Sequence, residues 1–305
     1  MKHPKRLKQG DKVGVAAPAG PVDPKILKKG LQTLERMGFY PVLAKHIFAK
    51  NRYLAGTDEQ RAQDLNGLFG DPEIKGIFCA RGGYGANRVL SGLNYSAIRM
   101  NPKVFVGSSD ITLLLLFLVQ QCSLVTFHGP MVAGNFGRYP MPKSKRQFSE
   151  ILFGNEVGKR LIAKGARVFR SGTAEGKVIG GCLTLLCRSL GTPWEVKTRN
   201  RILLIEDVNE PLYKIDGMLC HMKQAGKFMG VRGIVFGEMI NCQSSKKGGG
   251  SFKEILRDVF AKSSFPILTN FPSGHGQEMF TLPMGVEARL DTESKSLEFE
   301  NCGVL

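Results

Sequence analysis

Ser109 has a sequence context that suits a nucleophile. It lies in the turn Gly107-Ser108-Ser109-Asp110, between a predicted strand ending at Val106 and a predicted helix over Ile111 to Gln121. A turn from strand to helix raises a serine above the sheet and places the following N–H at the positive end of the helix. The turn departs from G-x-S-x-G, because Ile111 stands where a second glycine is expected. On the local pattern alone, a helix cap formed by Ser108, Ser109 or Asp110 is the better interpretation.

A serine nucleophile needs a base and a carboxylate that orients the base. Of the five histidines, His275 and His128 are the best candidates. His275 is flanked by Gly274 and Gly276, which leave its ring open to neighbours, and His128 follows a predicted strand. Glu206 and Asp207 end an apolar strand, where carboxylates tend to face a cleft. Ser109, Glu206 and His275 are therefore one set that could perform acyl transfer, although chain order alone does not establish it.

A glycine-rich turn, Arg81-Gly82-Gly83-Tyr84-Gly85, follows the predicted strand Gly76 to Ala80. Glycines let the backbone approach a ligand closely and leave N–H groups pointing outward. The turn matches neither nucleotide-binding fingerprint, G-x-G-x-x-G or G-x-x-x-x-G-K-[ST]. An anion or oxyanion cradle and a plain tight turn are equally compatible with it.

The elements that must position these residues alternate between strand and helix in the first half of the chain. Short apolar runs predict strands over residues 12–17, 40–43, 76–80 and 104–106. Helical spacing follows Asp23, and Thr57 is a predicted N-cap. This order predicts βαβ units and a mostly parallel sheet, with ligands at the carboxyl ends of its strands.

The pattern loosens after Asn135, and the sequence predicts three parts. These are an N-terminal domain over 1–135, a linker over 136–170 with at most one short helix, and a C-terminal domain over 171–305. The last part contains predicted strands over 201–205 and 233–237, helices over 215–225 and 252–260, a loop over 244–251, and a strand pair around Leu290 and Leu297.

Composition limits the classes of protein to which the chain can belong. It has 43 Lys and Arg against 26 Asp and Glu, a net charge of +17, which favours anionic partners. The basic stretch over 138–170 is either a solvated connector or an electrostatic funnel for an acidic substrate, and it matches no nucleic-acid motif. No apolar run is long enough for a membrane span, and the N-terminus has no apolar signal segment. Seven scattered cysteines without metal spacing indicate a reducing cytoplasm.

Taken in order, seven segments resemble the L,D-carboxypeptidases, the serine peptidases of the muramoyltetrapeptide carboxypeptidase and microcin C immunity group. They run through nearly the whole chain: Gly10 to Pro18, Tyr53 to Asp58, Arg81 to Gly85, Gly107 to Thr112, Phe127 to Met131, Glu206 to Asp216, and Gly274 to Gly276.

The resemblance implies a fold with a Rossmann-like (flavodoxin-like) N-terminal domain that carries the serine. A smaller C-terminal α/β domain with a β-rich core carries Glu and His. It implies Ser109 as nucleophile, His275 as general base and then acid, Glu206 as the orienting group, and the N–H groups of Gly83 and Asp110 as the oxyanion hole. It implies no metal, no cofactor, and a homodimer. Arg81, Gly82 and Arg88 are the predicted substrate-binding residues.

The activity implied is release of terminal D-alanine from a murein tetrapeptide, at its L-lysine or meso-diaminopimelate bond, in peptidoglycan recycling in the cytoplasm. One alternative is a microcin C-type self-immunity peptidase acting on an aminoacyl-nucleotide conjugate. Another is a non-catalytic binder of nucleic acid or peptidoglycan fragments, driven by the net charge. The peptidase interpretation expects neither a nucleic-acid nor a membrane partner. The chain departs from the family pattern at Ser108, where an aromatic residue is usual, and at Cys182, where asparagine usually follows the glycine pair.

Overall fold

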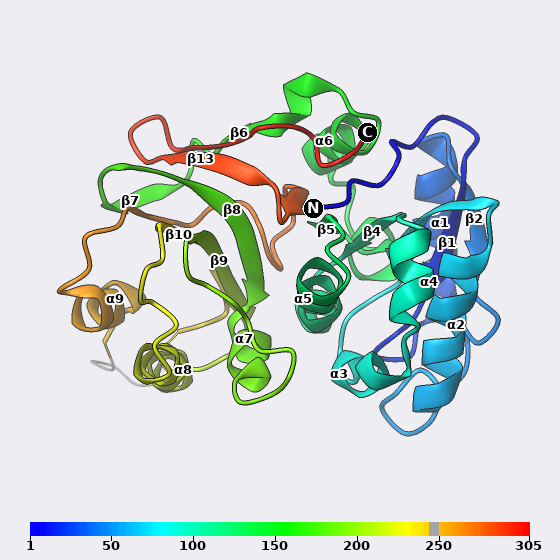
Figure 1. Ribbon diagram of the computed structural model, residues 1–305, viewed down its shortest axis with the longest axis horizontal. Helices are drawn as coiled ribbons and strands as arrows, with labels where there is room; N and C mark the ends of the chain where they lie inside the picture. Colours follow the sequence, from blue (N-terminus) through cyan, green and yellow to red (C-terminus); the bar gives the residue numbers. More distant parts are fainter. Residues whose placement is uncertain (244–249) are drawn as a thin grey trace.

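The computed structural model describes residues 1–243 and 250–305, so most of the loop predicted over 244–251 lies outside the described residues. Two lobes lie side by side, each built around one sheet (Figure 1). In that view the earlier part of the chain forms most of the right lobe and the later part most of the left lobe. No helix of the described residues is long and apolar enough to cross a bilayer.

The first sheet has the order β12-β5-β4-β3-β1-β2. Its five N-terminal strands are parallel, and each of the apolar runs predicted in the first half of the chain forms one of them. The sixth strand, β12, comes from the later part of the chain and pairs antiparallel with β5. The strands are β1 (Lys12–Ala16), β2 (Tyr40–Leu43), β3 (Ile74–Cys79), β4 (Val104–Gly107), β5 (Thr126–His128) and β12 (Leu282–Met284).

Two helices of this lobe begin at residues whose side chains cap the first turn. Asp23 caps α1, and Thr57 forms a capping box with Gln60 at the start of α2, as the sequence predicts. The buried helix α5 is apolar around most of its surface, which explains its long run of leucines. The helices are α1 (Pro24–Arg36), α2 (Asp58–Gly70), α3 (Ala86–Val89), α4 (Tyr95–Met100), α5 (Thr112–Gln121) and α6 (Pro142–Leu152), with a π-helical turn over Val132–Phe136.

The second sheet has the order β6-β14-β13-β8-β9-β10-β11-β7. Its centre, from β8 to β11, is parallel, and antiparallel strands flank it on both sides. The strands are β6 (Arg160–Ile162), β7 (Arg167–Arg170), β8 (Thr173–Cys182), β9 (Arg201–Val208), β10 (Gly233–Ile240), β11 (Ile267–Thr269), β13 (Glu287–Asp291) and β14 (Ser296–Phe299). Helices α7 (Leu183–Ser189), α8 (Leu212–Gln224) and α9 (Phe252–Phe260) accompany it.

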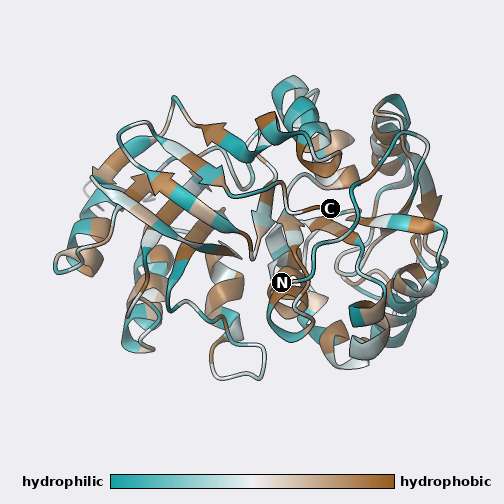
Figure 2. Cartoon of the chain, turned by 45° about the horizontal axis from the view of Figure 1, so that its top comes forward, coloured by the Kyte–Doolittle hydropathy of each residue, from teal (hydrophilic) through white to brown (hydrophobic). Residues whose placement is uncertain are grey.

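The structure differs from the linker predicted over 136–170. This stretch contains the 11-residue helix α6 and two strands, β6 and β7, at the two edges of the second sheet. Edge strands need no continuous apolar face, and β7 carries arginine at both ends, so the strand pattern was weak. Figure 2 shows the contrast between the mixed hydropathy of these outer segments and the apolar strands at the centre of each lobe.

Candidate active site

Ser109 lies in a sharp turn between β4 and α5. A 3₁₀ turn over Ser109–Ile111 comes between the strand and the helix, and Ser109 has a φ of 61°, in the left-handed region that non-glycine residues seldom adopt. Such strain concentrates at functional sites, and a sharp strand-to-helix turn holds a nucleophilic serine in the same way. Neither N-cap residue, Ser108 for the 3₁₀ turn or Ile111 for α5, makes a side-chain capping bond. The helix-cap interpretation of this turn is therefore wrong.

The glycine-rich turn after β3 packs directly against Ser109. A Cβ atom on Gly82 would lie 2.8 Å from Cβ and 2.9 Å from Oγ of Ser109, so only glycine fits there. The N–H of Gly20 donates to the Gly82 carbonyl (3.1 Å). Because the peptide is trans, the N–H of Gly83 points to the opposite side, away from Gly20. Among the described residues, this N–H has no hydrogen-bond partner.

Two buried charged side chains hold this turn in place. Arg61, only 1% exposed, donates to the carbonyls of Pro18 (2.7 Å) and Gly85 (2.8 Å). The Asp110 carboxylate accepts from the N–H of Ala86 (2.7 Å), and burial raises the pKa of Asp110 to about 6. Arg61 was not predicted from the sequence, although its spacing places it in line with Leu65 and Leu68 on the buried face of α2.

Glu206 and His275 form a hydrogen-bonded pair in the second lobe. Glu206 is fully buried in β9, and its Oε2 atom lies 2.7 Å from Nδ1 of His275. A Cβ on Gly274 would lie 2.7 Å from the same oxygen, so glycine lets the two side chains meet. This contact fixes the orientation of the ring through Nδ1. The other ring nitrogen, Nε2, is then the one that can exchange a proton with a serine.

The two groups shift each other's titration in opposite directions. Burial lowers the pKa of His275, but the charge and hydrogen bond of Glu206 outweigh burial and raise it above its ordinary value. Burial raises the pKa of Glu206, but the charge and hydrogen bond of His275 and the contact with His128 lower it to about 2. Glu206 is thus an ionised partner that stabilises the protonated imidazole, as the orienting acid of a triad does.

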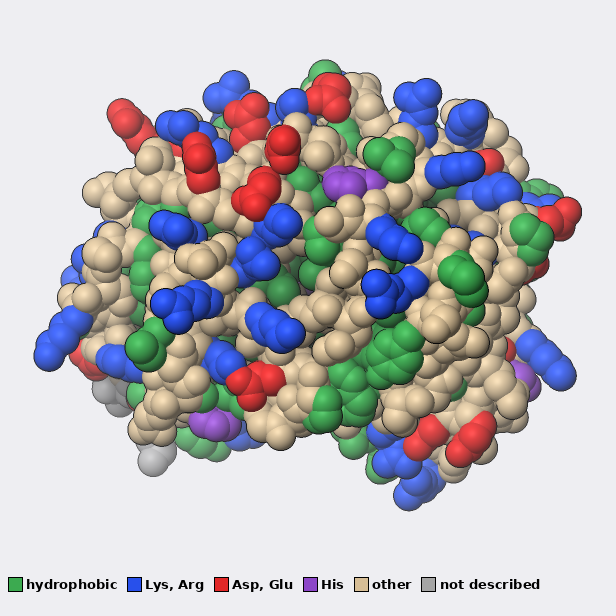
Figure 3. Space-filling view, viewed as in Figure 1, with side chains coloured by type: hydrophobic (Ala, Val, Ile, Leu, Met, Phe, Trp, Pro, Cys, Tyr) green, Lys and Arg blue, Asp and Glu red, His purple; other side chains and the backbone are tan. Residues whose placement is uncertain are grey.

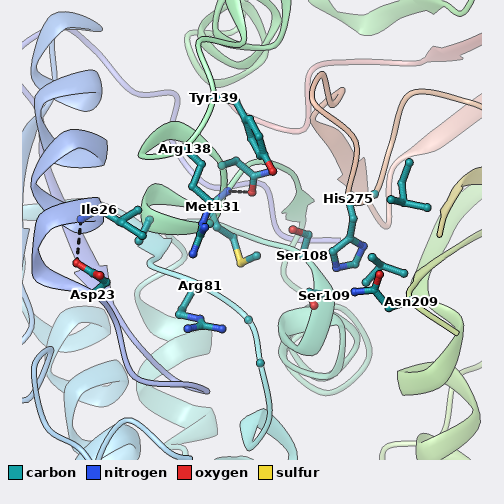
Figure 4. Close-up of a pocket in the computed structure, with 18 of the residues that line it drawn as sticks. Asp23, Ile26, Arg81, Ser108, Ser109, Met131, Arg138, Tyr139, Asn209 and His275 are labelled. Carbon is teal, nitrogen blue, oxygen red and sulfur yellow. Dashed lines mark hydrogen bonds between the residues drawn. The ribbon is translucent and has the colours of Figure 1, made fainter.

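A cavity of about 470 Å³ brings the two lobes' residues together. Ser109 and His275 line it beside Asn209, and Arg81 and Arg138 line the side toward α1 (Figure 4). With the oriented histidine as its base, the strained serine can attack a carbonyl carbon. The two guanidinium groups in the same cavity can bind an anionic substrate.

The structure brings most of the predicted residues to this cavity, but not all of them. Arg81, Gly82, Gly83, Ser109 and His275 line it, Asp110 follows Ser109 in the turn, and Glu206 lies behind His275. Arg88 is not a lining residue, and its guanidinium pairs with Asp58 at 2.8 Å. Arg138 and Asn209 line the cavity and were not predicted. Arg138 was seen only as one charge in a basic stretch.

His128, the other candidate base, is fully buried at the end of β5 and does not line the cavity. The two departures from the family pattern also differ in position. Ser108 lines the cavity, whereas Cys182 is buried beside Asp207, with Sγ 3.6 Å from Oδ1. Cys182 is not among the lining residues. Across the described ranges, 1–243 and 250–305, no group of three or more His, Cys, Asp or Glu is arranged to hold a metal ion.

Comparison with known proteins identifies the class. Residues 13–129 match the N-terminal domain and residues 175–290 the C-terminal domain of the LD-carboxypeptidases, peptidase family S66. The chain therefore belongs to this family and is a serine-type carboxypeptidase. This assignment argues against the non-catalytic binder.

The more similar relatives span nearly the whole chain. A probable murein peptide carboxypeptidase of Bacillus subtilis is 38% identical and covers 97% of this chain and 94% of its own. A murein tetrapeptide carboxypeptidase of Pseudomonas aeruginosa is 32% identical and covers 92% and 93%.

Solved structures agree on the fold. The microcin C7 self-immunity protein MccF, in its wild-type apo state, superposes with a TM-score of 0.92 at 27% identity, covering 98% of each chain. The muramoyltetrapeptide carboxypeptidase of Oxalobacter formigenes gives 0.83 at 25% identity, covering 94% of this chain and 97% of its own. The Rossmann-like lobe followed by a β-rich lobe, expected from the resemblance, is confirmed.

Proposed function

We propose that this protein is a serine L,D-carboxypeptidase that releases terminal D-alanine from murein tetrapeptide, with Ser109 as nucleophile. The observation that carries the proposal is the strained Ser109 turn facing the same cavity as a His275 ring bonded to buried Glu206. The names of the Bacillus, Pseudomonas and Oxalobacter relatives support murein peptide as the substrate class.

The proposed mechanism gives each of these groups a role. Ser109 Oγ attacks the carbonyl carbon of the bond before D-alanine, and Nε2 of His275 takes the serine proton. The N–H groups of Gly83 and Asp110 stabilise the negative oxygen of the tetrahedral intermediate, at about 3 kcal/mol per donor. His275 then gives the proton to the departing amine, which leaves a serine ester. A water molecule then attacks the ester while His275 takes its proton, and His275 returns that proton to Ser109 Oγ as the tripeptide leaves.

Substrate carboxylates are assigned to the two cavity arginines. Arg81 and Arg138 line the wall away from His275, and guanidinium groups bind carboxylates in bidentate geometry. Arg88 is already paired with Asp58, so it is less suited to bind a substrate carboxylate than the sequence predicted. Gly82 contributes by allowing the close approach of the turn to Ser109.

The proposal also covers the cellular compartment and the oligomeric state of the protein. Seven free cysteines, five of them buried, suit the reducing cytoplasm in which murein fragments are recycled. A homodimer remains part of the proposal and is tested by light scattering on the purified protein.

A second candidate is a self-immunity peptidase for an aminoacyl-nucleotide conjugate. Its support is the MccF structures, which superpose with a TM-score of 0.92 in complex with adenosine monophosphate and 0.90 with aspartyl sulfamoyl adenosine. The same Ser109, His275 and Glu206 would act on that substrate, so only the pocket's preference separates the two functions.

Mass spectrometry of substrate digests tests the proposal. The protein is incubated with murein tetrapeptides of the lysine and diaminopimelate types, with a tetrapeptide ending in L-alanine, and with aspartyl sulfamoyl adenosine. We expect loss of D-alanine from the first two, at least tenfold faster than any cleavage of the others. Faster turnover of the sulfamoyl adenosine would favour the second candidate.

A substitution of Ser109 tests whether this residue is the nucleophile. Ser109→Ala should abolish release and labelling by a fluorophosphonate probe, whereas Ser96→Ala, an exposed serine in α4, should retain both. A folded Ser109→Ala protein that retains full activity would refute the assignment.

A further inference from the structure

Glu206 lies between two histidines, one from each lobe. Its Oε2 atom bonds Nδ1 of His275 at 2.7 Å, and its Oε1 atom lies 3.7 Å from Nε2 of His128. Glu206 and His128 are both fully buried. The role proposed for the triad uses only the first of these contacts.

The second contact joins two atoms that have no other partner. Among the residues that the structure describes, neither Oε1 of Glu206 nor Nε2 of His128 makes a hydrogen bond. A buried polar atom without a partner costs about 1–3 kcal/mol. These two atoms face each other about half an ångström beyond the usual N–H···O distance. Hydrogen bonds in a catalytic site are often long without substrate and tighten in the complex.

Ser273 is the hydrogen-bond partner of the other ring nitrogen of His128. Its Oγ atom lies 3.2 Å from Nδ1 of His128, and Ser273 is fully buried. When the serine hydroxyl donates to Nδ1, the neutral ring carries its hydrogen on Nε2. That hydrogen then points at Oε1 of Glu206.

The position of His128 links it to the nucleophile. His128 ends β5 and pairs in register with Gly107 of β4, two residues before Ser109. Glu206 belongs to β9 in the other sheet, and His275 follows β11 in the chain. The contact between His128 and Glu206 therefore crosses from the sheet that carries the nucleophile to the sheet that carries the base.

We propose that His128 is a positioning residue: it donates from Nε2 to Oε1 of Glu206 and so aligns the Glu206–His275 pair with the lobe that holds Ser109. This inference rests on the proposed function of Ser109, Glu206 and His275. His128 does not line the cavity, so in this role it acts through Glu206.

Loss of this donor has a specific electrostatic consequence. With Oε1 left without a donor, more of the carboxylate charge acts on His275, and the protonated imidazole is stabilised further. Among the described residues, the other ionisable groups coupled to Glu206 or His275 are Asp207, Glu238, Cys182 and Cys242, and all remain in the variants below. A change in the titration of His275 would therefore come from His128.

The experiment compares three variants on the full chain. His128→Leu removes the donor, His128→Gln retains an N–H at a similar reach, and Thr126→Val is the matched control. Thr126 is also fully buried in β5, with a hydroxyl that has no partner among the described residues. The titration of His275 is followed by NMR on protein labelled with ¹⁵N-histidine, and kcat and KM for tetrapeptide are measured against pH.

In His128→Leu we expect the pKa of His275 to rise by about half a unit to one unit. The acid limb of kcat/KM should move with it, and kcat near pH 6.5 should fall about tenfold with KM nearly unchanged. His128→Gln should return both readouts toward the parent protein, and Thr126→Val should match it. If His128→Leu does not fold, Ser273→Ala should give a smaller shift in the same direction.

A His275 titration in His128→Leu (or Ser273→Ala) that coincides with the parent protein's overturns the inference. The NMR readout does not depend on turnover. A parent protein that cleaves no tetrapeptide would refute the proposed function, and the titration would still decide the role of His128.

Discussion

The protonation state of His275 decides whether Ser109 can lose its proton. The ring acts as a base only when neutral, and Glu206 raises the pKa of His275 above its ordinary value of 6.5. We therefore expect kcat/KM to rise with pH through a pKa above 6.5. Glu206, whose pKa is lowered to about 2, stays ionised throughout this range. A kcat/KM profile between pH 5 and 9 measures the limb, and a midpoint at or below 6.5 would contradict this prediction.

A Glu206→Gln variant provides the control for that profile. The uncharged amide no longer stabilises the imidazolium, so the acid limb of its residual activity should move to lower pH. The direction of the shift is the test, because a general loss of activity would leave the midpoint in place.

Residues with a recognisable local setting could be found from the sequence, and residues that act through distant contacts could not. Ser109 and His275 lie in glycine-containing turns, which are visible in the sequence. Arg61 holds the glycine-rich turn through carbonyls 43 and 24 residues away along the chain, and no local pattern encodes such contacts. Arg88 was assigned to substrate because its pairing with Asp58 is equally invisible in the sequence.

At the level of elements, the glycine-rich turn after β3 and the serine turn after β4 form one unit through their contact at Gly82. The Cβ of Gly82→Ala would lie 2.8 Å from Cβ of Ser109 and must displace it. A displacement approaching 1 Å costs about 100-fold in rate, so we expect a loss of that order in kcat/KM. Steady-state kinetics and thermal melts measure the effect.

Gly67→Ala is the matched substitution for this test. A Cβ there meets nothing within 4 Å, and Gly67 is exposed within α2. It should retain activity and raise the free energy of unfolding by up to about 1 kcal/mol. Equal activity of the two variants would show that the close approach at Gly82 does not matter.

The strands could be predicted from the sequence where nearly all of their residues are buried. Strands β1, β3 and β4 are nearly all buried and appear in the sequence as apolar runs. Strands β6 and β7 are short, partly exposed edge strands, so the sequence predicted a linker in their place. The membership of β12 in the first sheet was not predictable, because its partner β5 is far away in the chain.

At the scale of the whole molecule, the net charge of +17 creates an electrostatic field that extends beyond the cavity. Lys and Arg side chains are spread over the face in Figure 3, among fewer Asp and Glu. A positive field speeds the arrival of an anionic peptide, and salt screens it, with a Debye length of about 10 Å at 0.1 M. We expect kcat/KM for tetrapeptide to fall about three- to tenfold between roughly 0.05 and 0.5 M salt, with kcat nearly constant.

This measurement also separates the two interpretations of the basic stretch. A tetrapeptide whose carboxylates are amidated, apart from that of the terminal D-alanine, should show a weaker salt dependence than the parent peptide. If the two peptides respond equally, or neither responds, the charge does not steer substrate and the solvated-connector interpretation holds.

The pairing of β12 with β5 has a consequence for how the protein is made. During synthesis, β1 to β5 leave the ribosome long before residues 282–284, so the edge of β5 that carries His128 stays uncovered until then. An open edge of this kind invites pairing with other chains. The first lobe is therefore a poor candidate for expression on its own. Splitting the gene at the boundary between the lobes would separate β5 from the strand that covers it.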